Sequence, residues 1–347
     1  MLPKTPIGTI EGFFGSAWSH HARCDHIDFL AEQGASFYIY APKNDPYLRR
    51  QWQDLWPSFE FDTLHSLRRH CAERNIAFGV GLSPFGAHEL SEEELTAALK
   101  LRLTQINQLN PDIVGIFFDD MRGDTPLLAE KQLFCVHLVQ QLTQANIIFC
   151  PTYYSFDPIL EKVFGQMPHD YFDTLRQQLH PDIDIFWTGE KVCSRQYPLE
   201  HLHQVRELLG RKPFIWDNYP VNDGAVKSQH LHLSPVDHSL RQIFPAIAGR
   251  AINPMNQAYL SQIAMSSSIC AHHQQPWQQP SALSGPLYHQ LQQDINLFEE
   301  DGLSAIPDAL KENKQLTYAQ FLPNPFAQEV IAWLNGEYTF DPACLTD

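Results

Sequence analysis

The chain has 347 residues, of which 44% are hydrophobic, and this length suits one large domain with an extension or two modest domains. Acidic residues outnumber basic residues by 40 to 24, which gives a formal net charge of -16 at pH 7. Nucleic acids and anionic membranes attract basic surfaces, so this charge argues against both classes of partner.

Membrane and secretory signals are absent from the sequence. No stretch is long and apolar enough to cross a bilayer, and the first predicted strand follows too soon for a signal peptide to precede it. The seven cysteines are scattered and form no Cys-x-x-Cys pair. An odd number of scattered cysteines fits reduced thiols better than a disulfide framework. The sequence therefore predicts a cytoplasmic protein.

Eight short apolar runs, each bounded by turn residues, predict eight buried strands. In chain order they cover residues 9–15, 35–43, 76–84, 112–120, 147–154, 182–189, 213–220 and 247–254. Helical patterns lie between them, near residues 21–33 and 60–74 and from Ser91, where three acids follow a good capping residue. Successive strands are roughly 25–40 residues apart, which is about the size of a βα repeat unit.

Eight strands alternating with helical patterns favour an α/β fold of the (β/α)8 TIM barrel type. A doubly wound open sheet is the competing architecture, which the count of eight and the absence of a Gly-x-Gly-x-x-Gly turn disfavour. The polar segment from His272 to Pro280 is typical of a linker, and two or three helical patterns follow it, including 287–300 and 326–334. We therefore predict a barrel over residues 1–273 and a short C-terminal helical extension over residues 274–347, packed on the barrel.

The fourth predicted strand ends in two adjacent acids, Asp119 and Asp120. Two acids at the end of a buried strand are costly unless they face a cleft, although Asp also suits a turn or a helix cap. Active-site groups of such a barrel lie at the carboxyl ends of its strands. The other strand ends, with the residues just beside them, carry groups suited to binding a sugar: Gly12, Lys43, Tyr154, Trp187, Trp216, Asn218, Asp223 and Asn253.

These groups have distinct uses. Acids and amides bind hydroxyls, and Trp216 or Trp187 can stack on the face of a pyranose. Neighbouring carboxylates titrate as a coupled pair, in which one stays ionised while the other holds its proton to higher pH. The pair can therefore supply a general acid and a polarising base.

Several histidines invite a metal interpretation. Their spacings are irregular and they lie in predicted helices or loops, so surface or core histidines explain them better. The residues concerned are His20, His21, His26, His201, His203, His230, His232, His272 and His273, with Cys24 beside the first group. We predict no metal and no organic cofactor.

One short motif lies at nearly every predicted strand over residues 7–270. In order they are Glu11-Gly-Phe-Phe-Gly15, Ala41-Pro-Lys43, Phe117-Phe-Asp-Asp120, Cys150-Pro-Thr-Tyr-Tyr154, Trp187-Thr-Gly189, Trp216-Asp-Asn218, Asn222-Asp223 and Asn253-Pro254. Each motif is weak alone, but the ordered set resembles the family 84 glycoside hydrolases. These are β-N-acetylglucosaminidases that include the protein O-GlcNAcases.

The resemblance implies retaining hydrolysis of terminal β-linked GlcNAc by substrate-assisted catalysis. The 2-acetamido oxygen of the substrate attacks the anomeric carbon and forms an oxazoline, an exception to the scheme with an enzyme nucleophile. Asp119 is implied to accept the acetamide N–H, and Asp120 to act first as acid and then as base. Because Asp120 must keep its proton near neutrality, we expect it to have the drier environment and the higher pKa.

The resemblance also implies the groups that bind the sugar. Tyr154 is implied to hydrogen-bond the acetamide oxygen, whereas Tyr153 points the other way because neighbouring strand residues alternate. Asn218 is implied to position the acetamide. The groups implied to bind the sugar hydroxyls are Gly12 (through its carbonyl), Lys43, Asp223 and Asn253. Trp216 is implied to line the pocket.

Two departures from the family accompany these matches. Phe14 stands where the family often has tyrosine, so a hydroxyl is missing. The region after residue 273 is short and does not resemble the long helical stalk of animal O-GlcNAcases. The expected partner is a GlcNAc-bearing glycoconjugate or glycoprotein, and the aglycone and the oligomeric state stay open.

Two alternative functions also stay open. One is an N-acetylhexosaminidase that accepts both GlcNAc and GalNAc, or one that acts on glycosaminoglycan fragments. The other is a catalytically silent sugar-binding protein on the same scaffold, against which the presence of Asp119, Asp120 and Tyr154 argues.

Overall fold

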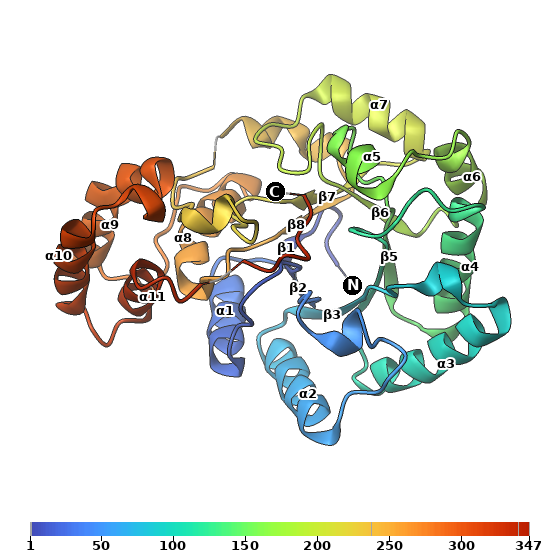
Figure 1. Cartoon of the computed structure of the whole chain (residues 1–347), viewed down its shortest axis with the longest axis horizontal. Helices are drawn as coiled ribbons and strands as arrows, with labels where there is room; N and C mark the ends of the chain where they lie inside the picture. The colour runs from blue at the N-terminus through green and yellow to red at the C-terminus, as the bar shows by residue number, and fades with distance from the viewer. Residues whose placement is uncertain (1, 237, 339, 347) are drawn as a thin grey trace.

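The computed structural model of the chain describes residues 2–236, 238–338 and 340–346. Its strands pair in parallel and in sequence order, and β1 also pairs with β8, so the sheet closes into a barrel (Figure 1). The strands are β1 (Ile7–Glu11), β2 (Phe37–Tyr40), β3 (Ala77–Leu82), β4 (Ile113–Phe117), β5 (Asn146–Cys150), β6 (Asp184–Trp187), β7 (Phe214–Asp217) and β8 (Gly249–Ile252). The predicted (β/α)8 barrel is confirmed, and the open sheet is excluded because the first and last strands are hydrogen-bonded to each other.

Helices cover the outside of the barrel and bury their apolar faces against it. They are α1 (His20–Glu32), α2 (Ser58–Glu73), α3 (Glu92–Gln108), α4 (Leu128–Leu142), α5 (Ile159–Phe164), α6 (Tyr171–Gln178), α7 (Leu199–Leu209) and α8 (Ala258–His272). Helix α3 begins as predicted, because Ser91 and Glu94 cap each other's backbone N–H groups. Between β7 and β8 the described residues form only the 3-10 turns η3 (Lys227–Gln229) and η4 (His238–Ala246), so the alternation of strand and α-helix lapses there.

The observed strands are shorter than predicted, mainly at their carboxyl ends. The chain leaves the sheet after Cys150, although the predicted strand runs over 147–154. The first strand begins earlier than predicted, at Ile7, and ends earlier, at Glu11 instead of residue 15. The bounds are wrong because Phe13 and Phe14 are apolar and buried, as strand residues are, yet they belong to a loop over the mouth of the barrel.

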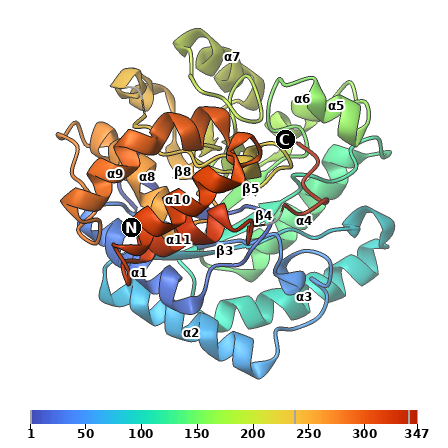
Figure 2. The same cartoon turned by 60° about the vertical axis from the view of Figure 1, so that its left-hand side comes forward.

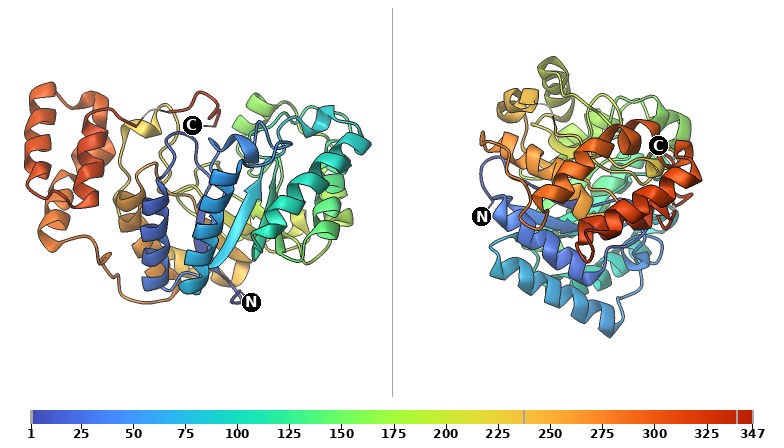
Figure 3. Two further views of the ribbon diagram at one scale, coloured as in Figure 1. Left: turned by 90° about the horizontal axis from the view of Figure 1, so that it is seen from below. Right: turned by 90° about the vertical axis from the view of Figure 1, so that its left-hand side faces the viewer.

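After α8 the chain forms a layer of helices on one side of the barrel (Figures 2 and 3). This layer consists of α9 (Gly285–Asn296), which continues into a π-helical turn (Leu297–Asp301), then α10 (Asp308–Ala319) and α11 (Pro325–Leu334). It shares a second buried cluster with α8, and the Glu329 carboxylate accepts the backbone N–H groups of Tyr259 and Leu260 at the start of α8. None of the helices in the described ranges is long and apolar enough to cross a bilayer.

Candidate active site

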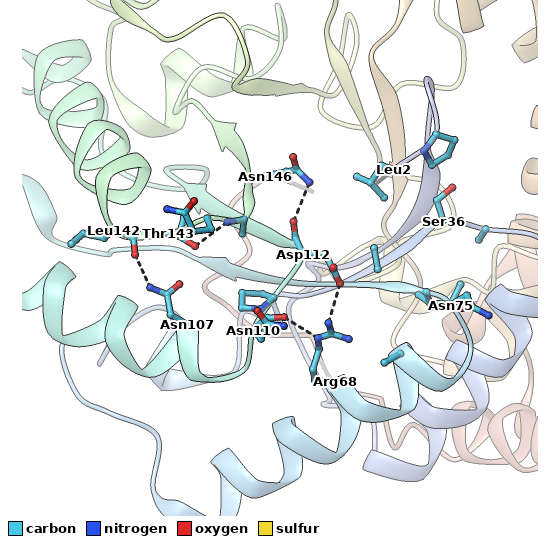
Figure 4. A pocket seen from close by; sticks show the side chains of 18 residues that line it. Leu2, Ser36, Arg68, Asn75, Asn107, Asn110, Asp112, Leu142, Thr143 and Asn146 are labelled. Carbon is cyan, nitrogen blue, oxygen red and sulfur yellow. Dashed lines mark hydrogen bonds and ion pairs between the residues drawn. The ribbon is translucent and has the colours of Figure 1, made fainter.

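The barrel has a hollow at each end. The hollow at the amino-terminal ends of the strands measures about 920 Å³ and is shown in Figure 4. Its polar side chains bond to nearby groups of the loops: Asn107 donates to the Leu142 carbonyl, and the Arg68 guanidinium lies 3.6 Å from the Asp112 carboxylate. Asp112 is the only acid of the described residues that lines it. This hollow therefore lacks the paired carboxylates that the sequence places at the other end.

The pocket at the carboxyl ends of the strands contains the nine residues to which the family resemblance assigns a role. It is a small cavity of about 40 Å³. Its lining consists of Gly12, Phe14, Lys43, Asp119, Asp120, Cys150, Tyr154, Thr188, Val192, Cys193, Trp216, Asn218, Val221, Asp223, Lys227, Asn253, Cys344 and Thr346. The fold thus brings together groups from loops after β1, β2, β4, β5, β7 and β8, because parallel strands end at one face of the barrel.

Asp119 is held by a buried ion pair. Its Oδ2 accepts a hydrogen bond from Lys43 Nζ, and both side chains are almost inaccessible to solvent. Within the described part of the chain, the other oxygen, Oδ1, is buried without a hydrogen-bond partner. A buried carboxylate oxygen without a donor is unfavourable. It is therefore a ready acceptor for an N–H or O–H group of a ligand.

Asp120 is the neighbouring acid and has a different set of contacts. Its Oδ1 accepts a hydrogen bond of 3.0 Å from the Tyr154 hydroxyl. Burial raises the pKa of Asp120, and the negative charge of Asp119 raises it further. This direction agrees with the prediction that Asp120 holds its proton.

Burial, the predicted cause, is the largest contribution to the raised pKa of Asp120. The two residues are nearly equally buried, with exposed fractions of 6% for Asp119 and 8% for Asp120, so their contacts also matter. What distinguishes them is the Lys43 ammonium, which forms its ion pair with Asp119. The proton is therefore expected on Asp120, because burial and the negative charge of Asp119 both favour its neutral form.

Arg49 is a site residue that the sequence did not reveal. It is 4% exposed, and its guanidinium donates to the Asp120 carbonyl (2.9 Å) and more weakly to the Asp119 carbonyl (3.5 Å). It lies against the rings of Phe14 and Phe85. These bonds fix the backbone at Asp120, whose φ of 53° is in the left-handed region. No local pattern signals this role, because the contact spans some 70 residues of chain.

A chain of amides forms one wall of the pocket. Asn253 Oδ1 accepts the Gly12 N–H (3.2 Å), while Asn253 Nδ2 donates to Asn218 Oδ1 (3.0 Å). The same Asn218 oxygen accepts the indole N–H of Trp216. A Cβ on Gly12 would lie only 2.5 Å from the Trp216 ring, so glycine is required for the ring to pack there. The wall is therefore preorganised by its own hydrogen bonds.

Asp223 contacts the loop after β1, next to the wall of amides. Its Oδ2 accepts the backbone N–H of Phe14 at 2.8 Å, and burial raises the pKa of Asp223 to about 6. Phe14 thus contributes its backbone, and its ring packs on Arg49 instead of supplying a hydroxyl. Asp223 is an additional hydrogen-bond acceptor in the pocket.

Two aromatic residues lie outside the pocket. Trp187 is fully buried and its indole N–H donates to His201, so the suggestion that it stacks on a sugar is wrong. Tyr153 points away as predicted, and its hydroxyl donates to the Gly165 carbonyl. Trp216 is the one of the two candidate tryptophans that lines the pocket, where its ring lies 5.5 Å from the Lys43 ammonium.

The histidines make structural contacts. His26 bonds to Thr9, and His272 and His273 bond to the carbonyls of Thr5 and Gly34. Among the residues that the structure describes, no group of three or more His, Cys, Asp or Glu is arranged to hold a metal ion. The seven cysteines all lie in the described ranges, and none of them forms a disulfide.

Comparison with known proteins gives one consistent result. The sequence model of the family described as β-N-acetylglucosaminidase matches residues 7–282. The Protein O-GlcNAcases of Rattus norvegicus and Mus musculus are each 30% identical over 258 residues, which cover 71% of this chain and 28% of theirs. The chain therefore spans just over a quarter of these relatives. A solved mutant of the Thermobaculum terrenum O-GlcNAc hydrolase superposes with a TM-score of 0.74 at 27% identity, over 95% of this chain and 80% of that one.

Proposed function

This chain belongs to the β-N-acetylglucosaminidase family, glycoside hydrolase family 84, and on that premise we propose that it is a retaining, O-GlcNAcase-like β-N-acetylglucosaminidase. It removes terminal β-linked GlcNAc from a glycoconjugate or glycoprotein. The observation that carries the proposal is the acid pair: Asp119 has an unpartnered buried oxygen, and beside it Asp120 has a raised pKa.

In the first step Asp119 Oδ1 accepts the acetamide N–H, which directs the acetamide oxygen at the anomeric carbon. As the new C–O bond forms, the bond to the leaving oxygen breaks and Asp120 gives that oxygen its proton. The product is the oxazoline in its protonated, oxazolinium form, which keeps the N–H proton, and the Asp119 carboxylate stabilises its positive charge. Lys43 holds the Asp119 carboxylate in place for this purpose through their buried ion pair.

In the second step Asp120, now a carboxylate, takes a proton from water as the water oxygen attacks the anomeric carbon. The oxazoline opens, and two displacements at one carbon leave its configuration unchanged. Burial raises the pKa of Tyr154 well above its usual value, so the phenol remains a neutral donor. Without a ligand the Tyr154 hydroxyl donates to the Asp120 carboxyl group. When substrate binds, this hydroxyl donates to the acetamide oxygen instead.

The acetamide mechanism is tested with aryl β-glycosides whose N-acetyl group carries zero to three fluorines. Fluorine withdraws electrons from the acetamide oxygen, so each substitution is expected to lower kcat/KM, by orders of magnitude over the series. The measurement is release of the phenol, with the α-anomer as the control that should stay intact. A rate independent of fluorination would mean that an enzyme group is the nucleophile, as in the common retaining scheme.

Replacing Arg49 with methionine is expected to lower kcat/KM by roughly tenfold to a hundredfold, because the acid pair loses its backbone support. Burial raises the pKa of Asp120 and the Arg49 charge opposes that rise, so removing the charge raises this pKa further. The acid then stays protonated to higher pH, and the alkaline limb of the pH profile of kcat/KM moves to higher pH. Arg49→Lys keeps the charge and should leave the limb in place. If the alkaline limb of the Arg49→Met protein stays at its original pH, the role of Arg49 is purely structural.

The proposal also includes the predicted location of the protein and the predicted division of the chain. A cytoplasmic location is supported by the seven cysteines of the described ranges, none of which forms a disulfide, because thiols persist in a reducing compartment. The division of the chain into a barrel over residues 1–273 and an extension over residues 274–347 is supported by the arrangement of α9, α10 and α11, which form a layer on one side of the closed barrel and share a buried cluster with α8.

A further inference from the structure

A segment of the chain itself enters the sugar pocket. After α11 the chain leaves the helical layer, and the described residues 340–346 lie at the mouth of the barrel (Figures 1 and 3). Cys344 and Thr346 are part of the pocket lining. They come from a part of the sequence that lies beyond the family match at residue 282.

The contacts of this segment are made with proposed substrate groups. Cys344 Sγ lies 3.9 Å from Asp223 Oδ1, and the Thr346 side chain hydrogen-bonds the Tyr154 phenol. Thr346 is only 9% exposed, whereas Leu345 between the two is 51% exposed. This alternation is that of an extended segment with one edge in the pocket and the other in solvent.

The space that is left does not suffice for a sugar. The remaining cavity of about 40 Å³ holds at most about three water molecules. An N-acetylhexosamine has about fifteen non-hydrogen atoms and needs a cavity several times larger, since ligand pockets measure some 300–1,000 Å³. Substrate and segment therefore exclude each other, both by volume and because they use the same Tyr154 and Asp223 groups.

The segment is anchored near the pocket at its other end. Helix α11 is fixed to α8 through Glu329, and Tyr338 packs against the second buried cluster. Asp341 then accepts the backbone N–H of Ala343 and Cys344 on its side-chain and carbonyl oxygens, which holds a turn directly before the pocket. A tether of this kind gives even a weak ligand a high effective concentration.

We propose that residues 341–346 are an intramolecular peptide ligand of the sugar pocket, which must withdraw before substrate binds. This inference rests on the proposed function, because the pocket that the segment fills is the proposed GlcNAc site. The segment acts as a competitive inhibitor: it reduces the fraction of molecules open to substrate and raises KM by the inverse of that fraction.

The test compares the full chain with a chain that ends at Phe340. With nine molecules in ten closed, the shortened chain is expected to have a KM for an aryl β-N-acetylglucosaminide about tenfold lower at unchanged kcat. In the full chain, Thr346→Glu places a carboxylate beside Asp120 and should reproduce the effect, whereas the matched control Leu345→Glu faces solvent and should not. An unchanged or higher KM in a shortened chain with native circular dichroism overturns the proposal.

A second measurement does not depend on catalysis. A synthetic peptide of residues 335–346, titrated calorimetrically into the shortened chain, is expected to bind saturably, and the Thr346→Glu peptide is expected to bind at least about tenfold more weakly. If neither chain hydrolyses the glycoside, the proposed function has failed, and the titration still decides the inference. Absence of saturable binding, or equal binding of the two peptides, overturns it.

Discussion

The Asp120→Ala protein is expected to hydrolyse substrates with poor leaving groups roughly a thousandfold to ten-thousandfold more slowly than the unaltered protein. Its loss removes the proton donor for the first step and the base for the second. A substrate whose leaving group departs without a proton, such as dinitrophenyl β-N-acetylglucosaminide, is expected to lose much less in the first step. The measurement is kcat/KM across a series of aryl glycosides, in which the dependence on leaving-group pKa should become steep.

Chemical rescue gives this prediction its control. Azide needs no general base, so it should attack the oxazoline in the Asp120→Ala protein and yield the β-glycosyl azide. The Asp120→Asn protein keeps the shape of the side chain and should behave in the same way. Equal losses for good and poor leaving groups would contradict the assignment of Asp120 as the acid.

The Asp119→Asn protein is expected to lose roughly a hundredfold to a thousandfold in kcat/KM, for good and poor leaving groups alike. Asp119 acts on the acetamide and on the charge of the oxazoline, and both are needed whatever group departs. An amide in its place neither carries the charge nor accepts the N–H as strongly, and it leaves Lys43 without its carboxylate partner.

The same substitution has a second effect with a definite sign. Burial and then the Asp119 charge raise the pKa of Asp120, so removing that charge lowers the pKa. Asp120 then loses its proton at lower pH, and the alkaline limb of kcat/KM moves down the pH scale, opposite to the Arg49→Met protein. Lys43→Met serves as the comparison, because it also breaks the ion pair but leaves the acetamide acceptor. A limb that stays in place would show that the two carboxyl groups do not interact as the structure implies.

Much of the fold was predictable because each strand carries its own signal. The apolar runs around Ile39, Val80 and Val114 are short, continuous and buried on both faces, which is typical of a parallel barrel. The ends of the strands were less predictable, since Phe13 and Phe14 meet the same apolar surroundings without joining the sheet. The region between β7 and β8 carries Pro235 and Pro245, and proline disrupts a regular helix, which fits the 3-10 turns found there.

The site was predictable where its residues lie in the loops that follow the strands within a few positions. Asp119 and Asp120 follow β4 after one intervening residue, Phe118, and topology alone then fixes the face to which they belong. Trp187 also ends a strand. Because side chains alternate along a strand, its ring points away from the pocket, and its indole N–H donates to His201. Arg49 contacts the backbone of the acid pair from a loop, and Thr346 enters the pocket from the segment that follows the helical layer. Their roles depend on contacts between distant segments, which leave no periodicity in the sequence.

The backbone at Asp120 has a consequence for the evolution and engineering of this chain. A residue with a Cβ in the left-handed region loses roughly 1–2 kcal/mol, and a second carboxyl group buried beside Asp119 adds repulsion. Asparagine tolerates that backbone better and carries no charge, so heat resistance and catalysis make opposite demands at this position. A screen for thermostability alone would favour the inactive protein. Stabilising changes are better sought in the outer helices, where the requirements of chemistry do not oppose those of folding.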